Sequence, residues 1–267
     1  IVMTEPKPKP PPAGGQSAPS KLRLAFSKAA DTGRIGVLFS PKVKARIDPH
    51  NFVVKRDKTV FDHTVANGNA AFLCDNDTGE VHTLSMAYHV HDPAQTKTHK
   101  HTEIGTSITR LAGYKSAQLV IAALALKEWW QSAPSDLIVT EIMPGNKPSL
   151  NVYRDHLGWS AVKDAATARE LHDLCNDYIA PADKGRPTLW FSCASHALPR
   201  MASILLRYMN DPAIRNKTTG HSIDLDLSAL EKAGLSRQRL RAIAKGITDK
   251  NLLRNLNRPS QGPTPNP

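Results

Sequence analysis

The chain has 267 residues, of which 40% are hydrophobic, and a formal net charge of +11. This length is sufficient to bury a hydrophobic core, in one large domain or two smaller ones, and the positive charge makes a polyanionic partner plausible. The three cysteines, Cys74, Cys175 and Cys193, are too scattered for a zinc-ligand pair or a disulfide framework. We therefore expect reduced thiols and a cytoplasmic location. No apolar run reaches the ~18 residues of a membrane span, so no membrane partner is predicted.

The first part of the chain predicts a tail followed by strands and one helix. Residues 1–20 are rich in proline and are expected to form a solvated tail. Residues 22–26 alternate as a strand does, and Asp31 is placed to cap a helix over residues 32–39. Residues 42–69 give no clear periodicity. Two hairpins follow, the first over residues 70–90 and the second continuing through residues 91–99.

Residues 103–142 then predict a strand, a basic glycine-containing turn, a helix and a second strand. This order is typical of a βαβ unit with parallel strands. The turn lies at the amino end of the helix, where unpaired backbone N–H groups attract anions, and Arg110 and Lys115 add positive charge. A P-loop and a dinucleotide fingerprint are both incomplete here, because Gly113 is the only glycine of the turn.

Two motifs resemble those of the GNAT superfamily of acyl-CoA-dependent N-acyltransferases. The segment Asn146-x-x-Ser149-x-x-x-Tyr153-x-x-x-x-Gly158-Trp159 is similar to the closing motif of that family, Asn-x-x-Ala/Ser-x-x-x-Tyr-x-x-x-Gly-Phe. Arg110-x-x-Gly113 resembles its pyrophosphate-binding loop. The sequence departs from that loop because Lys115 stands at the family's second glycine and the first leucine of the helix, Leu119, comes one residue late.

The resemblance covers roughly residues 21–165 and implies a fold and an activity. The expected fold is α/β, an α+β mixed sheet of the GNAT kind. The expected activity is acetyl-CoA-dependent N-acetylation of an amine, by direct transfer in a ternary complex. Residues expected to contact the cofactor are Ile108, Thr109, Arg110, Leu111, Ala112, Gly113, Tyr114, Lys115, Ser116, Asn146 and Ser149.

The resemblance also implies catalytic roles. Tyr153 matches the tyrosine that often donates its phenolic proton to the departing sulfur, and it is expected to face the gap between the two parallel strands. In this family the strand that corresponds to residues 103–109 splays from its neighbour, and a backbone amide exposed there, near Ile108, is expected to polarise the carbonyl. Glu103 opens the strand that lines the amine pocket, so it is a candidate general base, with a solvent-facing glutamate as the alternative. A histidine of the same region, His99 or His101, is a further candidate base.

Two histidine pairs, His89-x-His91 and His99-x-His101, flank the second hairpin loop. Alternate positions of a strand share a face, so hairpin pairing could bring the four rings together. A zinc or nickel site is conceivable on that ground. Surface histidines are the preferred interpretation, and no metal site is predicted.

Residues 166–258 predict an all-helical extension, followed by a tail over residues 259–267. Residues 225–245 resemble a helix-turn-helix, and residues 227–258 hold eight Lys and Arg against two acids. Nucleic acid is an expected partner of this region, through Arg237, Arg239, Arg241 and Lys245. The amine acceptor is expected to be macromolecular, with RNA, a DNA-bound protein and a protein lysine or N-terminus all open. The alternative function is a degenerate GNAT-fold binding module that contacts nucleic acid or protein through these helices.

Overall fold

The computed structural model describes residues 19–90, 101–133, 137–176 and 178–256. Within these ranges nine strands form one sheet in the order β6-β7-β5-β4-β3-β2-β1-β9-β8. The strands are β1 (Lys21–Phe26), β2 (Ala70–Asp75), β3 (Val81–Val90), β4 (His101–Thr109), β5 (Leu137–Ile142), β6 (Ser160–Ala161), β7 (Leu189–Ser192), β8 (Ala213–Arg215) and β9 (Ser222–Asp226). Neighbours from β1 to β4 are antiparallel, whereas β4 and β5 are parallel. The predicted mixed sheet with an antiparallel first half is confirmed.

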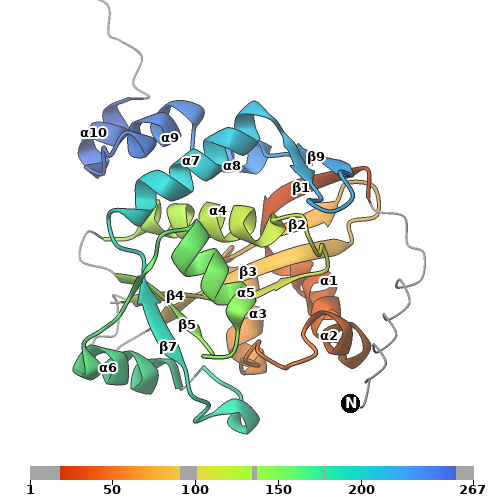
Figure 1. Ribbon diagram of the computed structural model, residues 1–267, viewed down its shortest axis with the longest axis vertical. Helices are drawn as coiled ribbons and strands as arrows, with labels where there is room; N and C mark the ends of the chain where they lie inside the picture. The colour runs from red at the N-terminus through yellow and green to blue at the C-terminus, as the bar shows by residue number, and fades with distance from the viewer. Residues whose placement is uncertain (1–18, 91–100, 134–136, 177, 257–267) are drawn as a thin grey trace, which may run out of the picture.

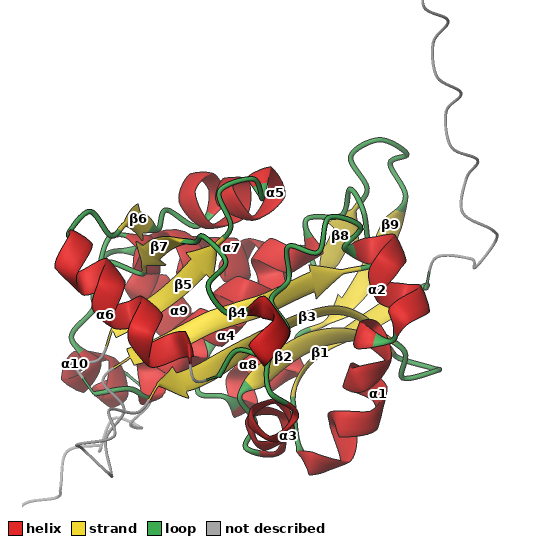
Figure 2. Cartoon of the chain, turned by 90° about the horizontal axis from the view of Figure 1, so that it is seen from below, coloured by secondary structure: helices red, strands yellow, loops and turns green. Residues whose placement is uncertain are grey.

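Helices cover both faces of this sheet (Figures 1 and 2). On one face lies α4 (Ser116–Gln131), with α7 (Ala197–Asn210) packed on α4 and α9 (Arg237–Ala244) packed on α7. The other face carries α1 (Thr32–Gly36), α2 (Pro41–Ile47), α3 (Lys58–Ala66) and α6 (Ala165–Asn176). The remaining helices are α5 (Lys147–Leu150), α8 (Ser228–Lys232) and α10 (Lys250–Asn255). Because both faces are covered, β2 is buried on both sides.

Helix α4 is the centre of the larger hydrophobic core. Its residues 119–126 are each at most 1% exposed, because the sheet covers one side and α7 covers the other. A helix that is apolar on all sides is the expected sequence for such a position. Its amino end is therefore held rigidly with respect to β4, which matters for the site described below.

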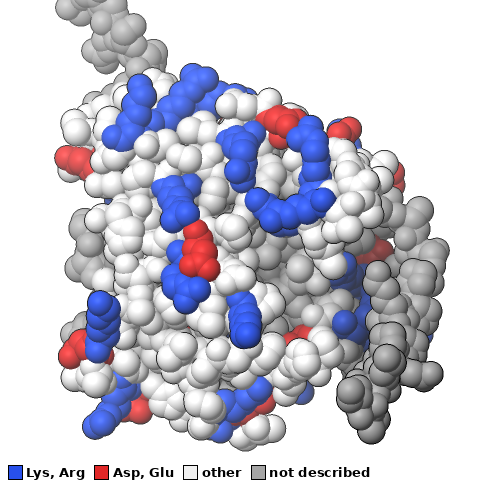
Figure 3. Space-filling model, in the orientation of Figure 1, with Lys and Arg blue, Asp and Glu red and all other residues white. Residues whose placement is uncertain are grey.

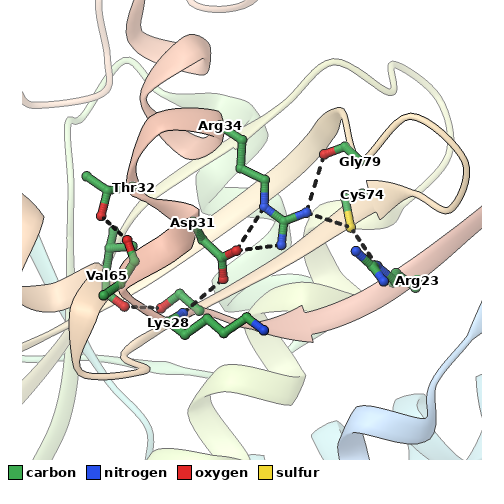
Figure 4. A network of polar contacts seen from close by, with 10 residues as sticks. Arg23, Lys28, Asp31, Thr32, Arg34, Val65, Cys74 and Gly79 are labelled. Carbon is green, nitrogen blue, oxygen red and sulfur yellow. Dashed lines mark hydrogen bonds and ion pairs between the residues drawn. The ribbon is translucent and has the colours of Figure 1, made fainter.

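Helix α1 is fixed to the hairpin of β2 and β3 by polar contacts (Figure 4). Asp31 accepts a hydrogen bond from the backbone N–H of Lys28 at 2.9 Å and pairs with Arg34 at 2.6 Å. Arg34 in turn donates to the carbonyl of Gly79 at 3.5 Å and lies 3.8 Å from the sulfur of Cys74. The guanidinium of Arg34 thus ties the first helical segment to the β2–β3 hairpin.

The region after residue 165 differs from the all-helical prediction. The predicted helices are present, but β7 pairs with β5, and β9 pairs with β1 and β8. These strands have only three to five residues, too few to show alternation in the sequence. This region shares the sheet and the main core with the preceding part of the chain.

The predicted helix-turn-helix corresponds to α8, a turn at Gly234 and α9, and it begins at Ser228 because residues 222–226 form β9. Arg239 is buried, with its guanidinium 3.9 Å from the centre of the Trp130 ring. Its predicted role in nucleic-acid binding is wrong on this geometry, since the side chain stabilises the packing of α9. Arg237 donates to the carbonyl of Met209 at 2.9 Å. Arg241 and Lys245 are exposed.

Candidate active site

Strands β4 and β5 are paired only at their first residues. His101, Thr102 and Glu103 face residues 137–139, and the strands then diverge. We call the space between residues 104–109 of β4 and residues 140–142 of β5 the wedge. Because these parts of two parallel strands do not pair with each other, backbone groups of β4 on this side are available to other partners.

A β-bulge in β4 shapes one side of the wedge. The register with β3 shifts between Leu84 and Met86, and Thr106 has a left-handed φ of 49°. For a β-branched residue this conformation is strained. The hydroxyl of Tyr88 lies 2.6 Å from that of Thr106 and helps to hold the bulge. Bulges of this kind often redirect side chains next to active sites.

The phenol of Tyr153 lies inside the wedge, as predicted. Its hydroxyl is 3.1 Å from the hydroxyl of Ser107 and donates to the carbonyl of Ile104 at 3.4 Å. The ring contacts Trp159 edge to face, with 5.1 Å between ring centres. Burial raises the pKa of Tyr153 to about 12. The hydroxyl therefore keeps its proton over the physiological pH range and can act as a hydrogen-bond donor.

Tyr153 belongs to a π-helix, Asn151–His156, which continues α5. The backbone N–H of Leu157 donates to the carbonyl of Val152 at 2.9 Å, five residues back along the chain. This wider turn absorbs the one additional residue between Tyr153 and Gly158 relative to the family motif. The insertion is thus accommodated after the tyrosine, which keeps its place in the wedge.

A cavity of about 240 Å³ opens beside the wedge, and we call it the wedge cavity. Its lining includes residues 107–109 of β4, Ala117 and Ile121 of α4, and Tyr153. The first turn of α4 has no side-chain cap. Its backbone N–H groups and the positive end of the helix dipole are therefore at the border of the cavity.

In the predicted anion-binding turn, three side chains are engaged with the rest of the protein. The guanidinium of Arg110 is paired with Glu80, and it lines neither the wedge cavity nor the cavities described below. Its predicted contact with a cofactor is therefore corrected. Leu111 is buried in the core. The hydroxyl of Ser116 is bonded to Thr83 at 2.9 Å and to Thr109 at 3.0 Å, so only its backbone is available to an anion.

Lys115 has a left-handed φ of 53°. The family motif places glycine here, and glycine adopts this conformation without steric cost, whereas a side chain is disfavoured by about 1–2 kcal/mol. Lys115 thus retains the backbone turn of the family and adds a cation. Its side chain is exposed, which leaves the ammonium group at the amino end of α4.

Asn146 and Ser149 both line the wedge cavity. The side-chain oxygen of Asn146 accepts a hydrogen bond from the backbone N–H of Ser149 at 3.2 Å and so caps α5. This capping role is the alternative to a cofactor contact for the oxygen. The side chain nevertheless borders the cavity, so the predicted cofactor contacts of both residues remain predictions.

A buried group of charges lies next to the wedge, made of Arg56, Glu103 and Glu141. One guanidinium nitrogen of Arg56 is 2.5 Å from Glu103 and 3.1 Å from Glu141. Burial raises the pKa of Glu103 to about 7, even though the charge of Arg56 opposes this shift. Glu103 is completely buried, so the solvent-facing alternative is wrong. Among the described residues, one oxygen of Glu103, one oxygen of Glu141 and two nitrogens of Arg56 have no hydrogen-bond partner.

Two further cavities meet at this charge group. A connecting cavity of about 40 Å³ is lined by Tyr153, Ser107, Arg56 and Glu141 among others. A large cavity of about 640 Å³ lies between α1, α2, α3 and residues 53–56, and it shares Arg56 with the connecting cavity. The three cavities therefore follow one another from the first helices to Tyr153. Glu103 lines none of the three cavities, whereas Glu141 lines the connecting cavity.

Of the four histidines in the two predicted pairs, the structure describes His89 and His101, and neither lines these cavities. His101 pairs with Val90 and Leu137 at the closed end of the β4–β5 pair and borders none of the three cavities. Its predicted role as a base is therefore not supported by position. His91 and His99 lie outside the described residues. Among the residues that are described, no cluster of three or more His, Cys, Asp or Glu could hold a metal ion. In the same part of the chain, no helix is long and apolar enough to cross a membrane.

Comparisons with known proteins concern the fold alone. No family model and no curated protein matches the chain. Among solved structures, Arabidopsis thaliana Naa50 in complex with the bisubstrate analogue CoA-Ac-MVNAL is similar with a TM-score of 0.44 and 12% identity, over 65% of this chain and 99% of that one. Ribosomal-protein-S5-alanine acetyltransferase from Vibrio fischeri has a TM-score of 0.43 and 12% identity, over 64% and 91%. Diaminobutyrate acetyltransferase EctA from Paenibacillus lautus is similar with a TM-score of 0.41 and 11% identity, over 65% of this chain and 94% of that one.

The order of the elements and the diverging β4–β5 pair are those that the sequence motifs predicted. The chain has a GNAT-like fold. Sequence reasoning placed Tyr153 and the wedge but missed Arg56 and Glu141. The signal for Glu141 was one acidic residue in an otherwise apolar strand, whereas Arg56 lies in a stretch without periodicity.

Proposed function

We propose that this protein is an acetyl-CoA-dependent N-acetyltransferase of the GNAT type that acts on an amine. The observation that carries the proposal is the hydroxyl of Tyr153 inside the wedge, between a cavity at the amino end of α4 and a second cavity that ends at Glu141. The first cavity suits a cofactor with phosphate groups, and the second leads to a separate entrance for an amine. Direct acyl transfer of the GNAT type needs the cofactor and the amine to meet at one point.

The residues present fit the phosphate-containing part of such a cofactor. The uncapped first turn of α4 offers backbone N–H groups, and Lys115 adds an exposed cation beside them. The wedge cavity would accept the narrow arm of the cofactor between β4 and α5. When bound, acetyl-CoA would supply an acetyl group activated as a thioester.

The chain's own groups would then act on charge that develops in the wedge. Tyr153 holds a proton at its phenolic oxygen, and a donor there stabilises negative charge on a sulfur atom, since a thiol pKa of about 8.5 lies below that of the phenol. Backbone N–H groups of β4, Ile108 or a neighbour, are placed to polarise a carbonyl. One such donor contributes on the order of 3 kcal/mol.

Glu141 is the proposed proton acceptor for the amine. It borders the connecting cavity together with Tyr153, and one of its oxygens has no hydrogen-bond partner within the part of the chain that the structure describes. Glu103, predicted as the base from sequence, is completely buried and lines none of the three cavities, and it is proposed to tune the charge of the group. Removal of a proton by a positioned carboxylate typically contributes about 10²–10⁴-fold to a rate.

The large cavity is the proposed entrance for the acceptor. Phe39, Phe61 and Val53 give it apolar walls, while Lys44 and Lys55 lie at its border. An amine attached to an apolar group fits this lining, and a protein N-terminus or lysine could reach into it. The macromolecular acceptor predicted from the sequence is therefore retained as part of the proposal.

The proposal is tested by binding and by transfer. Acetyl-CoA at a hundred times its dissociation constant should stabilise the folded protein by about 2.7 kcal/mol, seen as a rise in melting temperature. Mass spectrometry of amine and peptide pools incubated with labelled acetyl-CoA should then reveal the acetylated class. The absence of any stabilisation by acetyl-CoA would reject the proposed function.

A further inference from the structure

A second cavity at the amino end of α4 is strongly basic. It measures about 250 Å³ and we call it the basic hollow. Four cations line it, Lys115, Arg207, Arg215 and Lys217, against one acid, Asp211. The cations come from the turn before α4, from α7, from β8 and from the turn after β8. Figure 3 shows Lys and Arg side chains gathered around a hollow over α7 and the β8–β9 hairpin.

The hairpin that brings Lys217 to Lys115 is fixed in place by hydrogen bonds. The side chain of Asn216 donates to the carbonyl of Ala112 at 3.1 Å, and the backbone N–H of Lys217 donates to the carbonyl of Gly113 at 3.3 Å. A Cβ atom at Gly113 would lie 3.0 Å from Asn216, so the close approach favours glycine there. The hairpin is thus docked on the turn that precedes α4.

The cations of the basic hollow are only partly neutralised. Arg215 pairs with Asp211 at 2.6 Å, but for Lys115, Arg207 and Lys217 the described residues show no ion pair. Burial, together with the charges of Lys217 and Arg207, lowers the pKa of Lys115. Like charges held together repel, and Lys115 also occupies a strained backbone conformation. Binding an anion in the hollow would offset the repulsion among these cations and the cost of the strained backbone at Lys115.

The basic hollow and the wedge cavity lie on the same short segment. Residues 107–109 and Ala117 line the wedge cavity, while Tyr114 and Lys115 line the hollow. The wedge cavity, at about 240 Å³, is smaller than the ~300–1,000 Å³ usual for drug-sized ligands. It suits the narrow arm of a larger ligand, whose remaining part must lie outside it.

We propose that the basic hollow binds the phosphates of the nucleotide end of CoA, with the C-terminal part of the chain supplying Arg207, Arg215 and Lys217. This inference rests on the proposed function. It also gives a role to Lys115, where the turn departs from the family motif. Because Arg110 is engaged by Glu80, the hairpin provides cations in its place.

The test is calorimetric titration of the full chain with adenosine 3′,5′-bisphosphate and with CoA. The double variant Arg207→Gln/Lys217→Ala removes two exposed cations of the hollow. The control, Arg169→Gln/Lys163→Ala, removes two exposed cations on and next to α6 and changes the net charge equally. We expect the first variant to bind both ligands at least about tenfold more weakly, and the control to bind them as the unaltered protein does.

A kinetic measurement separates this inference from the proposed function. With S-acetylpantetheine, which lacks the nucleotide, the hollow variant should show an unchanged KM. Equal affinity of both double variants for the bisphosphate overturns the phosphate subsite. The subsite is also overturned if the hollow variant loses binding to duplex RNA or DNA while neither the unaltered protein nor either variant binds the bisphosphate. Absence of acyl transfer in every variant, with bisphosphate binding still weakened only in the hollow variant, overturns the proposed function and leaves the subsite standing.

Discussion

Two groups of buried charges border the same sheet, one around Glu128 and one around Glu103. Glu128 on α4 lies 2.8 Å from His89 and 2.9 Å from Lys127, and Lys127 also donates to the carbonyl of Gly68. Although burial opposes ionisation, the hydrogen bond from His89 and the charge of Lys127 lower the pKa of Glu128. This group is paired, and it borders none of the three cavities near Tyr153.

The group around Glu103 has the opposite character. Two carboxylates share the single guanidinium of Arg56, and burial raises the pKa of Glu103 to about 7. Buried polar atoms without partners are rare in folded proteins, and perturbed acids beside a cavity are typical of functional sites. The contrast supports the proposal that the group around Glu103 takes part in the site, whereas the group around Glu128 does not.

The largest expected effect is on kcat, which should fall on substitution in the group around Glu103 and not in the group around Glu128. Glu141→Gln should lower kcat by about 10²–10⁴-fold, because the amide cannot accept the amine proton. The measurement is steady-state transfer to the best acceptor over a range of pH. Glu128→Gln is the control and should keep kcat, since its partners lie outside the site. Equal losses in both variants would contradict the assignment of Glu141.

The next effect concerns stability. Arg56→Met should lower the free energy of unfolding by about 3–5 kcal/mol, because two buried carboxylates lose the guanidinium that pairs with both of them. Urea unfolding at neutral pH measures it. The loss should shrink in mild acid, where Glu103, whose pKa is raised to about 7, becomes protonated.

Lys127→Met gives the matched change in the paired group. It should cost less than Arg56→Met, because Glu128 keeps His89 at 2.8 Å. If the two substitutions lower the free energy of unfolding equally, the two groups do not differ in their contribution to stability, and this prediction is wrong.

A smaller effect is expected at Tyr153. Tyr153→Phe removes one donor from the wedge and should lower kcat about tenfold to a hundredfold, with little change in CoA affinity. Tyr178→Phe removes a hydroxyl that donates to the carbonyl of His89 at 3.2 Å, on the side of the paired group, and should leave kcat unchanged. Rates and calorimetric affinities of both variants decide the question, and an unaltered rate in Tyr153→Phe rejects the donor role.

The smallest effect is on the pH dependence of stability, and its sign differs between the groups. The pKa of Glu103 is raised from 4.5 to about 7, so the folded protein binds an extra proton in that window and stability falls as the pH rises through it. The pKa of Glu128 is lowered, so its contribution is present above its ordinary value and is lost as the pH falls through the folded value.

Glu103→Gln should therefore flatten the decline between pH 4.5 and about 7. Glu128→Gln should flatten the loss at lower pH instead. Unfolding free energies at a series of pH values test both slopes, and an unchanged slope in Glu103→Gln would show that another group titrates there.

The sequence predicted the elements whose signals are local. The strand, turn, helix and strand around α4 follow from periodicity, and the motif at Tyr153 indicated the wedge. The charge group at Arg56 could not be predicted, because its partners lie 47 and 85 residues away along the chain. Arg110 was assigned to an anion for the same reason, since Glu80 pairs with it only once the sheet has formed. The strands β7, β8 and β9 are too short to recognise before their neighbours are known.

The docking of Asn216 on the turn at Gly113 has a consequence for biosynthesis. The first 133 residues contain β4 and α4, yet the turn between them gains its last hydrogen bonds only when residues 216 and 217 have been made. On a ribosome, the nascent polypeptide would thus complete the proposed nucleotide subsite late in translation. Chains released before residues 216 and 217 are made should lack these hydrogen bonds to the turn.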